Sequence, residues 1–453
     1  MRRLASRSFR WERDVARRES AEDQAPIGET RTKRTARSRA RLFVCGPSIL
    51  AYVSPPSVLD FFREAKWLTP ERARGWCRVL AAVTAIGVVV WVAFSRDGVD
   101  HDGKPLGTDF ASFWIAARLA REGHVSAVYD PSLYAAVQER LFPTMSGRYM
   151  YPYPPPFLLL CLPLAFLAYL PALVAWLGAT FVPFFTCVRR ILPERWAILP
   201  VFAFPAVFAN LGHGHNGFLT AACLGGAMIL AEERPYLAGL CLGFLIFKPH
   251  LALVAPFALL AARRWRVIAG AATSAITFCA LSLAVLGGDA WRGFRQMTRL
   301  SRSIVEQGLA EYWKMQSVFS AVRLVHGGIR LAYAVQIVVA IGVLALVVKT
   351  ALRRPGAEAE GALVVAATPL CIPYIMDYDL VLLALPLAWT LARARASAWE
   401  PWEKIVLFAA YVLPLVARPL AMAAALPLAP VVLGALFAIV LRRVRREETT
   451  PVT

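Results

Sequence analysis

Apolar stretches and short polar loops alternate along this chain from about residue 79 to residue 441. The apolar stretches lie at about residues 79–95, 156–188, 197–211, 216–232, 235–247, 249–262, 267–286, 331–349, 361–376, 379–392, 405–418 and 420–441. A helix needs about 20 residues to cross the hydrocarbon layer, and several of these stretches are shorter. The pattern therefore predicts an all-α polytopic membrane protein with about twelve transmembrane helices.

The positions of arginine and lysine predict how these helices are oriented. Alternating crossings from a basic N-terminus place five basic loops on one side: VRRILPERW, RRWR, KTALRRPG, LARARASAWEPWEK and LRRVRREE. Positively charged loops mark the cytoplasmic side, so both termini are expected there. The same count places two longer loops, residues 96–155 and 287–330, on the outer side together with the HGHN, KPH and DYD segments. We therefore expect polar features that are far apart in the sequence to meet on the outer face.

Composition agrees with this class of protein. Hydrophobic residues make up 58% of the 453 residues, and the formal net charge is +20. The excess positive charge lies in the N-terminal region and in loops between apolar stretches, where it sets topology, so it does not predict nucleic-acid binding. The eight cysteines are dispersed without a CxxC pair, which predicts neither a zinc site nor a disulfide framework.

Residues 1–75 differ from the rest of the chain. They are rich in arginine and small polar residues and lack sustained apolar periodicity, which predicts a disordered or surface-associated cytoplasmic tail. A cleavable signal peptide is not expected, because no apolar core follows the first arginines. The tail could bind anionic lipid or represent an over-extended start of the reading frame. The membrane domain is expected over residues 76–445, followed by a short cytoplasmic tail at 446–453.

Asp109 begins an aromatic-rich amphipathic run in the first outer loop, within the segment GTDFASFWIAARL. Either Thr108 or Asp109 could cap a helix that lies along the membrane surface. Alternatively, the Asp109 carboxylate could lie at the rim of a cavity and remove a proton from an incoming hydroxyl group. The local sequence is compatible with both roles.

Two further polar clusters fall on the same predicted face. The stretch YMYPYPPPF contains Tyr151 and Tyr153, either as ordinary interfacial tyrosines or as site residues. The glycine-rich reversal NLGHGHNGF contains His213, His215 and Asn216, which are costly at membrane depth unless they face water or a polar ligand. Two histidines alone are a weak indication of a metal site, so contact with a phosphate or a sugar is the favoured interpretation.

Charged residues also interrupt two later apolar stretches. Lys248 lies in FLIFKPHLALV just before a helix-breaking proline, where it could extend to the interface or pair with a lipid phosphate. Asp377 and Asp379 lie in IMDYDLV at another outer turn, as helix caps or as site residues.

The second outer loop is expected to form helices over the outer face. Aromatic side chains alternate there with arginines, which suits an amphipathic element that recognises lipid headgroups or a lid packed on the bundle. Glu306 and Glu311 in this loop are candidate second carboxylates.

Six segments, in order along the chain, resemble motifs of glycosyltransferase family 87. They are GTDFASFWIAARLAREGHVSAVYD, YPYPPPFLLLCLPLAFL, HNGFLTAACLGGAMIL, RPYLAGLCLGFLIFKPHLALVAPFALLAARRWR, YWKMQSVFSAVRL and IPYIMDYDLVLLALPLAW. The resemblance runs from about residue 79 to residue 441 and implies a GT-C fold, a multi-spanning helical bundle with outer loops that carry the acceptor side of the site. It also implies similarity to polyprenol-phosphate-mannose-dependent mannosyltransferases, which typically form alpha-1,2 linkages on lipid glycans.

The resemblance implies roles for individual residues. Asp109, in GTDF, matches the family's proposed general base. Gly214-His215-Asn216 stands where related proteins often have Gly-Gln-Asn, and Lys248-Pro249-His250 stands where many have Lys-Pro-Gln. The residues expected to bind the donor phosphate or sugar are Lys248, His213, His215, Asn216 and His250. The expected accessory residues are Tyr151, Tyr153, Trp313, Lys314, Asp377 and Asp379.

Together these features predict an integral membrane hexosyltransferase, mannosyltransferase-like, that acts on the outer face of a bacterial plasma membrane. It would move the sugar, with inversion, from a polyprenyl-phosphate donor to a hydroxyl of a lipid-linked or cell-envelope glycan. Membrane lipids, the donor and the glycan acceptor are the expected partners. No metal or other cofactor is expected, because such a donor already carries its leaving group. The alternative is a transporter or flippase of lipid-linked sugars, which is less favoured because the chain shows no internal repeat.

Overall fold

The computed structural model describes residues 57–449. Most of the predicted N-terminal tail, residues 1–56, and the last four residues of the predicted C-terminal tail, 450–453, lie outside the described residues. Within the described part every regular element is a helix, and pairing of extended backbone is limited to isolated bridges. The predicted all-α class is therefore confirmed for this part of the chain.

The described chain begins with two helices, α2 (Val58–Glu64) and α3 (Pro70–Ala93). The sequence predicted a disordered or surface-associated tail over residues 1–75, whereas α2 and the start of α3 are helices within that range. Ser57 and Asp60 form a capping box for α2, and Thr69 caps α3 with Pro70 at its first position. These local end signals start helices ahead of the apolar run, because they satisfy backbone N–H groups without any apolar periodicity.

Five described helices are long and apolar enough to cross a membrane. They are α3, α7 (Tyr169–Ile191), α13 (Trp265–Glu306), α15 (Ile329–Ala351) and α18 (Glu403–Ala424). A sixth span results if η3 (Arg195–Ala197) and α8 (Ile198–Phe202) are joined with α9 (Pro205–His213), across a bend of 52°. The structure is therefore that of a membrane protein, whereas twelve crossings and the GT-C fold stay predictions.

Shorter apolar helices fill the middle of the bundle. They are α6 (Pro155–Cys161) with η2 (Leu162–Phe166), α10 (Gly217–Leu230), α11 (Pro235–Gly243) with η4 (Phe244–Phe247), η5 (Pro249–Ala252) with α12 (Ala255–Ala261), and α16 (Ala357–Cys371) followed by η7 (Asp377–Leu383) and α17 (Ala384–Ala396). A 14-residue helix is about 21 Å long, which is less than the roughly 30 Å of a hydrocarbon layer. Polar groups at the ends of such helices can therefore lie inside the protein.

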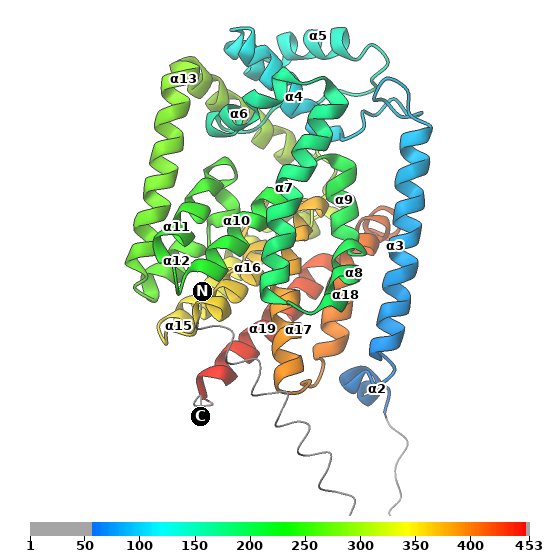
Figure 1. Cartoon of the computed structure of the whole chain (residues 1–453), viewed down its shortest axis with the longest axis vertical. Helices are drawn as coiled ribbons and strands as arrows, with labels where there is room; N and C mark the ends of the chain where they lie inside the picture. The colour runs from blue at the N-terminus through cyan, green and yellow to red at the C-terminus, as the bar shows by residue number, and fades with distance from the viewer. Residues whose placement is uncertain (1–56, 450–453) are drawn as a thin grey trace, which may run out of the picture. The chain divides into compact units, whose positions relative to one another are not determined.

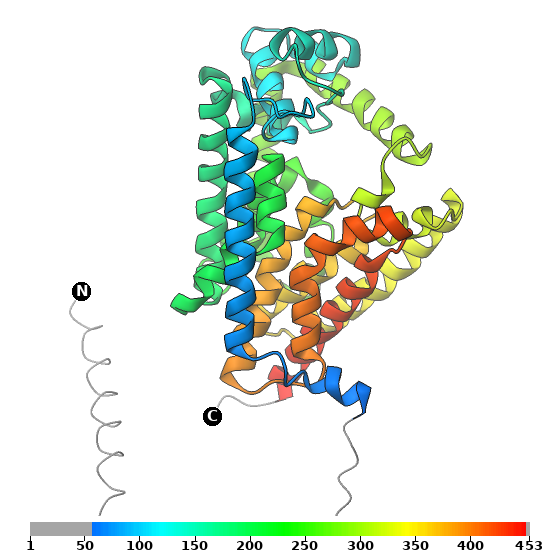
Figure 2. The ribbon, with the colours of Figure 1, turned by 90° about the vertical axis from the view of Figure 1, so that its right-hand side faces the viewer.

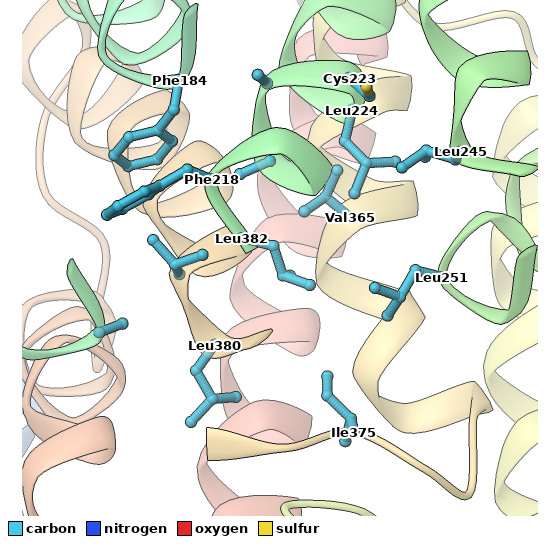
Figure 3. Close-up of a cluster of buried hydrophobic side chains, with 14 of the residues drawn as sticks. Phe184, Phe218, Cys223, Leu224, Leu245, Leu251, Val365, Ile375, Leu380 and Leu382 are labelled. Atoms are coloured by element: carbon cyan, nitrogen blue, oxygen red, sulfur yellow. The ribbon is translucent and has the colours of Figure 1, made fainter. Parts of the chain in front are cut away.

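The core joins these short helices to the long ones (Figure 3). Phe184 of α7 stacks on Phe218 of α10 with the ring centroids 5.3 Å apart. Leu245 from η4, Val365 from α16 and Leu382 from η7 are buried in the same cluster. This apolar packing holds the helix ends that carry the polar residues.

The two predicted outer loops pack against each other. The first forms α4 (Thr108–Arg121), η1 (Val125–Tyr129) and α5 (Pro131–Leu141), which gather at one end of the bundle (Figure 1). In the second, α13 breaks at Gly287, where φ is 76° and ψ is 174°, and continues as a helical arm to Glu306. Tyr129 and Phe294 join the two loops, with ring centroids 6.3 Å apart.

The five basic loops meet at the opposite end, where ion pairs link them. Arg264 pairs with Glu360 at 2.8 Å, and Arg395 pairs with Glu194 at 3.6 Å. Further pairs are Arg264–Glu232, Arg393–Glu358, Arg393–Glu447, Arg442–Glu400, Arg446–Glu400 and Arg443–Glu403. The predicted grouping of these loops is confirmed. Figure 2 views the bundle from the side of α3, which runs from α2 at the basic end to the end that carries α4 and α5.

The remaining described helices are η6 (Tyr312–Lys314), α14 (Val318–Leu324) and α19 (Leu428–Thr449). Gln316, between η6 and α14, donates its backbone N–H to the Ile375 carbonyl at 2.8 Å, and Met315 forms a bridge with Met376. The YWKMQS segment is thereby fixed against the chain that leads into DYD.

Candidate functional site

The site begins at the first turn of α4. Gly107 is the N-cap residue of this helix, in the left-handed conformation with φ of 73°, and no side chain caps the helix. Asp109 lies in the first turn, where the helix dipole favours a negative charge. The capping role considered for Asp109 is therefore wrong, because its carboxylate makes no capping hydrogen bond. Its Oδ2 is buried and has no hydrogen-bond partner among the described residues.

A close backbone approach brings the HGHN turn to this helix end. Gly214 ends α9 with φ of 59°, and an added Cβ there would lie 2.6 Å from the Phe110 Cβ and 3.2 Å from the Gly107 Cα. Glycine is needed at such a position because it tolerates positive φ and leaves room for a neighbouring backbone. The indole N–H of Trp176 donates to the Gly214 carbonyl at 3.1 Å and fixes the turn.

Asp109 and His213 face each other across this contact. Asp109 Oδ2 lies 3.7 Å from His213 Nδ1, which is too long for a hydrogen bond but within ion-pair range. His213 Nδ1 hydrogen-bonds instead to the Thr108 hydroxyl at 2.7 Å. Burial raises the pKa of the Asp109 carboxyl, and the positive charges of His213 and Lys248 oppose that rise. The Asp109 carboxylate therefore lies near positive charges, while its Oδ2 makes no hydrogen bond to them.

His215 lies on the other side of the turn and is fully buried. Its Nε2 is 2.8 Å from the Tyr153 hydroxyl, and its ring stacks on Tyr378 with the centroids 3.7 Å apart. His215 Nδ1 is buried without a hydrogen-bond partner among the described residues. The structure therefore brings Tyr153, from the first outer loop, into the same cluster as the histidine turn.

Two asparagines flank the same turn. Once its amide is oriented to satisfy its neighbours, Asn210 donates to the His215 carbonyl at 3.1 Å and accepts from the Gly217 backbone N–H at 3.1 Å. Asn216 is fully buried, and neither atom of its amide has a hydrogen-bond partner among the described residues. Unpaired buried amide groups are unusual, and they mark Asn216 as available to a polar ligand.

The two aspartates of the DYD segment each pair with a cation. Lys248 donates to Asp379 at 2.7 Å, and both side chains are buried. Asp377 accepts from Arg418 of α18 at 3.3 Å. The Lys248 ammonium also lies 5.4 Å from the centre of the Tyr378 ring. Because removal of either partner would leave a buried charge unpaired, the Lys248–Asp379 pair fixes the position of DYD.

Arg418 is the more open of these two cations. Its side chain is 33% exposed, against 6% for Lys248. The guanidinium carbon lies 4.8 Å from the centre of the Trp313 ring, so Trp313 and Asp377 hold it from two sides. Its other N–H groups make no hydrogen bond to the described residues, which leaves them available to an anion.

His250 and Tyr151, two further predicted site residues, make no side-chain hydrogen bond within this cluster. The His250 side chain is exposed and makes no hydrogen bond or ion pair to another described side chain, although it lies within electrostatic range of Lys248 and Asp379. Tyr151 is fully buried, with its ring stacked on Phe157 and its hydroxyl unpaired among the described residues.

The candidate second carboxylates are both paired. Lys314 forms an ion pair with Glu311. Glu306 pairs with Arg302 at 2.6 Å and accepts from Tyr333 at 3.0 Å. These contacts give both glutamates structural partners, in the second outer loop and at Tyr333 of α15.

Sequence reasoning missed Tyr378 and Arg418 as site residues, and it considered Thr108 only as a helix cap. Tyr378 could have been found from its position between two aspartates in DYD. Arg418 had a signal as well, since an arginine between apolar stretches is costly in a membrane without a partner. Nothing in the local sequence shows that Thr108 contacts His213, because these residues are 105 positions apart.

The arrangement suits proton removal beside an anionic group. The buried Oδ2 of Asp109 has no hydrogen-bond partner among the described residues, and the positive charges of His213 and Lys248 act on it. Apolar packing surrounds the helix ends that carry these residues. In the part of the chain that the structure describes, no group of three or more His, Cys, Asp or Glu side chains is placed to hold a metal ion.

The fold and these contacts define a helical membrane protein with a buried acid, histidine and ion-pair cluster. Residues 151–373 match the model of glycosyltransferase family 87. This match confirms the family that the sequence motifs resemble, and together with the apolar helices it identifies a membrane glycosyltransferase. The matched region includes the HGHN and KPH segments, whereas Asp109 lies before it and DYD follows it. Neither a curated protein nor a solved structure was found to match the chain.

Proposed function

We propose that this protein is a GT-C hexosyltransferase that transfers a mannosyl group from a polyprenyl-phosphate donor to a hydroxyl of a lipid-linked or cell-envelope glycan. The observation that carries this proposal is the buried, unpaired Oδ2 of Asp109 beside His213. A carboxylate that lacks a partner can accept a proton, and its raised pKa makes it a stronger base than an ordinary surface aspartate.

Asp109 acts as the general base in a single inverting displacement. The acceptor oxygen forms a bond to the anomeric carbon while its proton passes to Asp109. The bond between the anomeric carbon and the donor phosphate oxygen breaks, and the phosphate leaves with the electron pair. His213 orients the Asp109 carboxylate through its charge, and Thr108 orients His213 through the 2.7 Å hydrogen bond.

Arg418 binds the leaving phosphate in this mechanism. Its guanidinium is partly exposed and supported by Trp313 and Asp377, and guanidinium groups bind phosphate through two parallel hydrogen bonds. Lys248 supports the site from within its buried pair with Asp379. Asn216, with a fully unpaired amide, binds sugar hydroxyls. The contacts of Arg418 with the phosphate strengthen as negative charge develops on the leaving oxygen, and this lowers the activation barrier for transfer.

The position of the basic loops indicates which face of the membrane carries the active site. The site lies at the end of the bundle opposite the five basic loops, and basic loops mark the cytoplasmic side in the positive-inside rule. We therefore place the active site on the periplasmic face of a bacterial inner membrane, with no metal required for the transfer.

Sugar transfer in isolated membranes tests the proposal. Membranes that contain the wild type, Asp109→Asn or Asp102→Asn are supplied with radiolabelled polyprenyl-phosphate mannose and native lipid acceptors. Asp109→Asn keeps the size of the side chain but removes the base, and Asp102, which is exposed in the same loop, provides the matched control. We expect transfer by the wild type and Asp102→Asn and a loss of at least about 100-fold in Asp109→Asn, which is the usual contribution of a general base. Equal transfer by all three proteins would refute the role of Asp109.

A further inference from the structure

A large apolar cavity lies at the basic end of the bundle, away from the candidate active site. It has a volume of about 790 Å³ and is lined by the first half of α3, the end of α7, α8, α17 and α18 as far as Leu415. This volume lies within the range of about 300–1,000 Å³ that is typical of ligand pockets. The apolar lining continues along α18 to Leu415, but Lys404 at the charged rim is about 21 Å along the helix from Arg418 in the active site, so the two charged sites are distinct.

The cavity exists because α3 does not pack closely on the bundle. Among the residues of α3 only Cys77 is buried, and its apolar stretch is 6% buried within the protein. Water is a poor occupant of a space with apolar walls at membrane depth, whereas an acyl chain gains about 0.8 kcal/mol per buried methylene group. The apolar walls therefore favour a hydrocarbon chain.

The rim of the cavity carries positive charge and hydrogen-bond donors. Lys404 lies 5.6 Å from the centre of the Trp399 ring and forms no ion pair with a described residue. Arg395 lies 5.1 Å from the centre of the Trp196 ring and pairs with Glu194 at the longer distance of 3.6 Å.

Trp196 provides a second, independent observation. Its indole Nε1 is buried in the region of this cavity and has no hydrogen-bond partner among the described residues. The Tyr411 hydroxyl in the same wall is satisfied, since it donates to the Pro200 carbonyl at 2.8 Å. An unpaired buried donor next to Arg395, in a wall that also carries Lys404, fits a ligand that presents a negative oxygen at the end of an apolar chain.

From these features we infer that the cavity binds one anionic glycerophospholipid, with an acyl chain against α3 and the phosphate at Lys404, Arg395 and Trp196. The lipid supplies the packing that α3 otherwise lacks. This site is separate from any donor or acceptor site at Asp109, and it does not depend on the proposed sugar transfer.

Native mass spectrometry of the purified full chain tests the inference. The protein is delipidated in detergent, supplied with phosphatidylglycerol or phosphatidylcholine, and the fraction that retains one lipid is measured. Ala388→Phe fills the cavity, and Ala82→Phe places the same side chain on an exposed position of α3. Lys404→Ala removes a rim charge, and Lys349→Ala removes an exposed lysine of α15 as its control.

We expect the wild type to retain phosphatidylglycerol at least about fivefold more than phosphatidylcholine. Ala388→Phe and Lys404→Ala should each lower this retention at least about fivefold, and both control variants should retain it as the wild type does. Lys404→Ala keeps the test decisive if Ala388→Phe fails to fold, because Lys404 lies at the rim. If a segment of the chain outside the described residues or a second copy fills the cavity, the wild type will show no preference for phosphatidylglycerol, and the inference is overturned.

Discussion

Asp109 Oδ2 lies 3.7 Å from His213 Nδ1, although the two residues belong to helices separated by about a hundred positions in the chain. Two left-handed glycines, Gly107 and Gly214, allow this approach because neither has a Cβ in the space between the two helix ends. The distance permits attraction between the charges but leaves the carboxylate oxygen free of a hydrogen bond. This relationship underlies the predictions for the active site.

The pH dependence of transfer should follow the ionisation of Asp109. Because burial raises its pKa, activity should increase with pH through an apparent pKa above that of an ordinary aspartate, as the carboxyl loses its proton and becomes a base. His213→Gln removes a positive charge that lowers this pKa, so the acidic limb of the profile of kcat/KM should move to higher pH by about 0.5–1 unit.

The matched control for this shift is His101→Gln, since His101 is an exposed histidine of the same outer loop. Its profile should coincide with that of the wild type. An acidic limb that stays in place, or moves to lower pH, in His213→Gln would contradict the assignment of Asp109 as the titrating base.

Gly214→Ala should destabilise the protein and reduce transfer together. The new Cβ would lie 2.6 Å from the Phe110 Cβ, at a positive φ that alanine tolerates poorly, and we expect a loss of about 2–3 kcal/mol in the free energy of unfolding. Unfolding in detergent and transfer in membranes are the measurements. Gly212→Ala is the control, because no atom lies within 4 Å of its added Cβ. Wild-type stability and transfer in both variants would refute the close approach of Gly214 to Phe110 and Gly107.

Removing one partner of the buried Lys248–Asp379 pair should strongly lower the free energy of unfolding. Asp379→Asn leaves the lysine charge buried without a counter-charge, which should cost about 3–5 kcal/mol in the free energy of unfolding. The double variant Lys248→Met with Asp379→Leu should cost less than the sum of its single variants. Denaturant unfolding in detergent measures these changes.

An exposed pair provides the comparison for this experiment. Glu122→Gln breaks the pair of Glu122 with Arg118, which has a distance of 3.7 Å and lies near the surface, so the expected cost is about 1 kcal/mol or less. Similar losses in Asp379→Asn and Glu122→Gln would mean that the Lys248–Asp379 pair is solvated and does not fix DYD.

Arg418→Gln should raise the KM for the polyprenyl-phosphate donor about 10- to 100-fold, because the side chain loses the charge that binds phosphate. Arg418→Lys should recover part of the affinity through its charge but not the paired hydrogen bonds. Steady-state transfer at varied donor concentration distinguishes the two variants. Arg330→Gln, at an exposed position, should leave the KM unchanged, and an unchanged KM in Arg418→Gln would exclude the phosphate role.

Much of the architecture follows from local sequence patterns. Apolar runs predict helices because burying an apolar face stabilises them, and clusters of arginine predict which loops share an end of the bundle. The ion pairs among Arg264, Glu360, Arg393 and Glu447 confirm that grouping. The twelve crossings stay a prediction: five described helices, or six with the bent pair, are long and apolar enough to span, and several other apolar runs form shorter helices.

By itself, the sequence determined the helical class, the membrane setting, the family and the residue types that could carry chemistry. Only the tertiary structure decided which polar residues meet: it brought His213 to Asp109, paired Lys248 with Asp379 and left the His250 side chain without a hydrogen bond to the described residues. The physical reason is that helix periodicity reports on burial of a face, whereas contacts between distant helix ends depend on close backbone packing. Residues such as Gly107 and Gly214 permit that packing, and their partners are not visible in the local sequence.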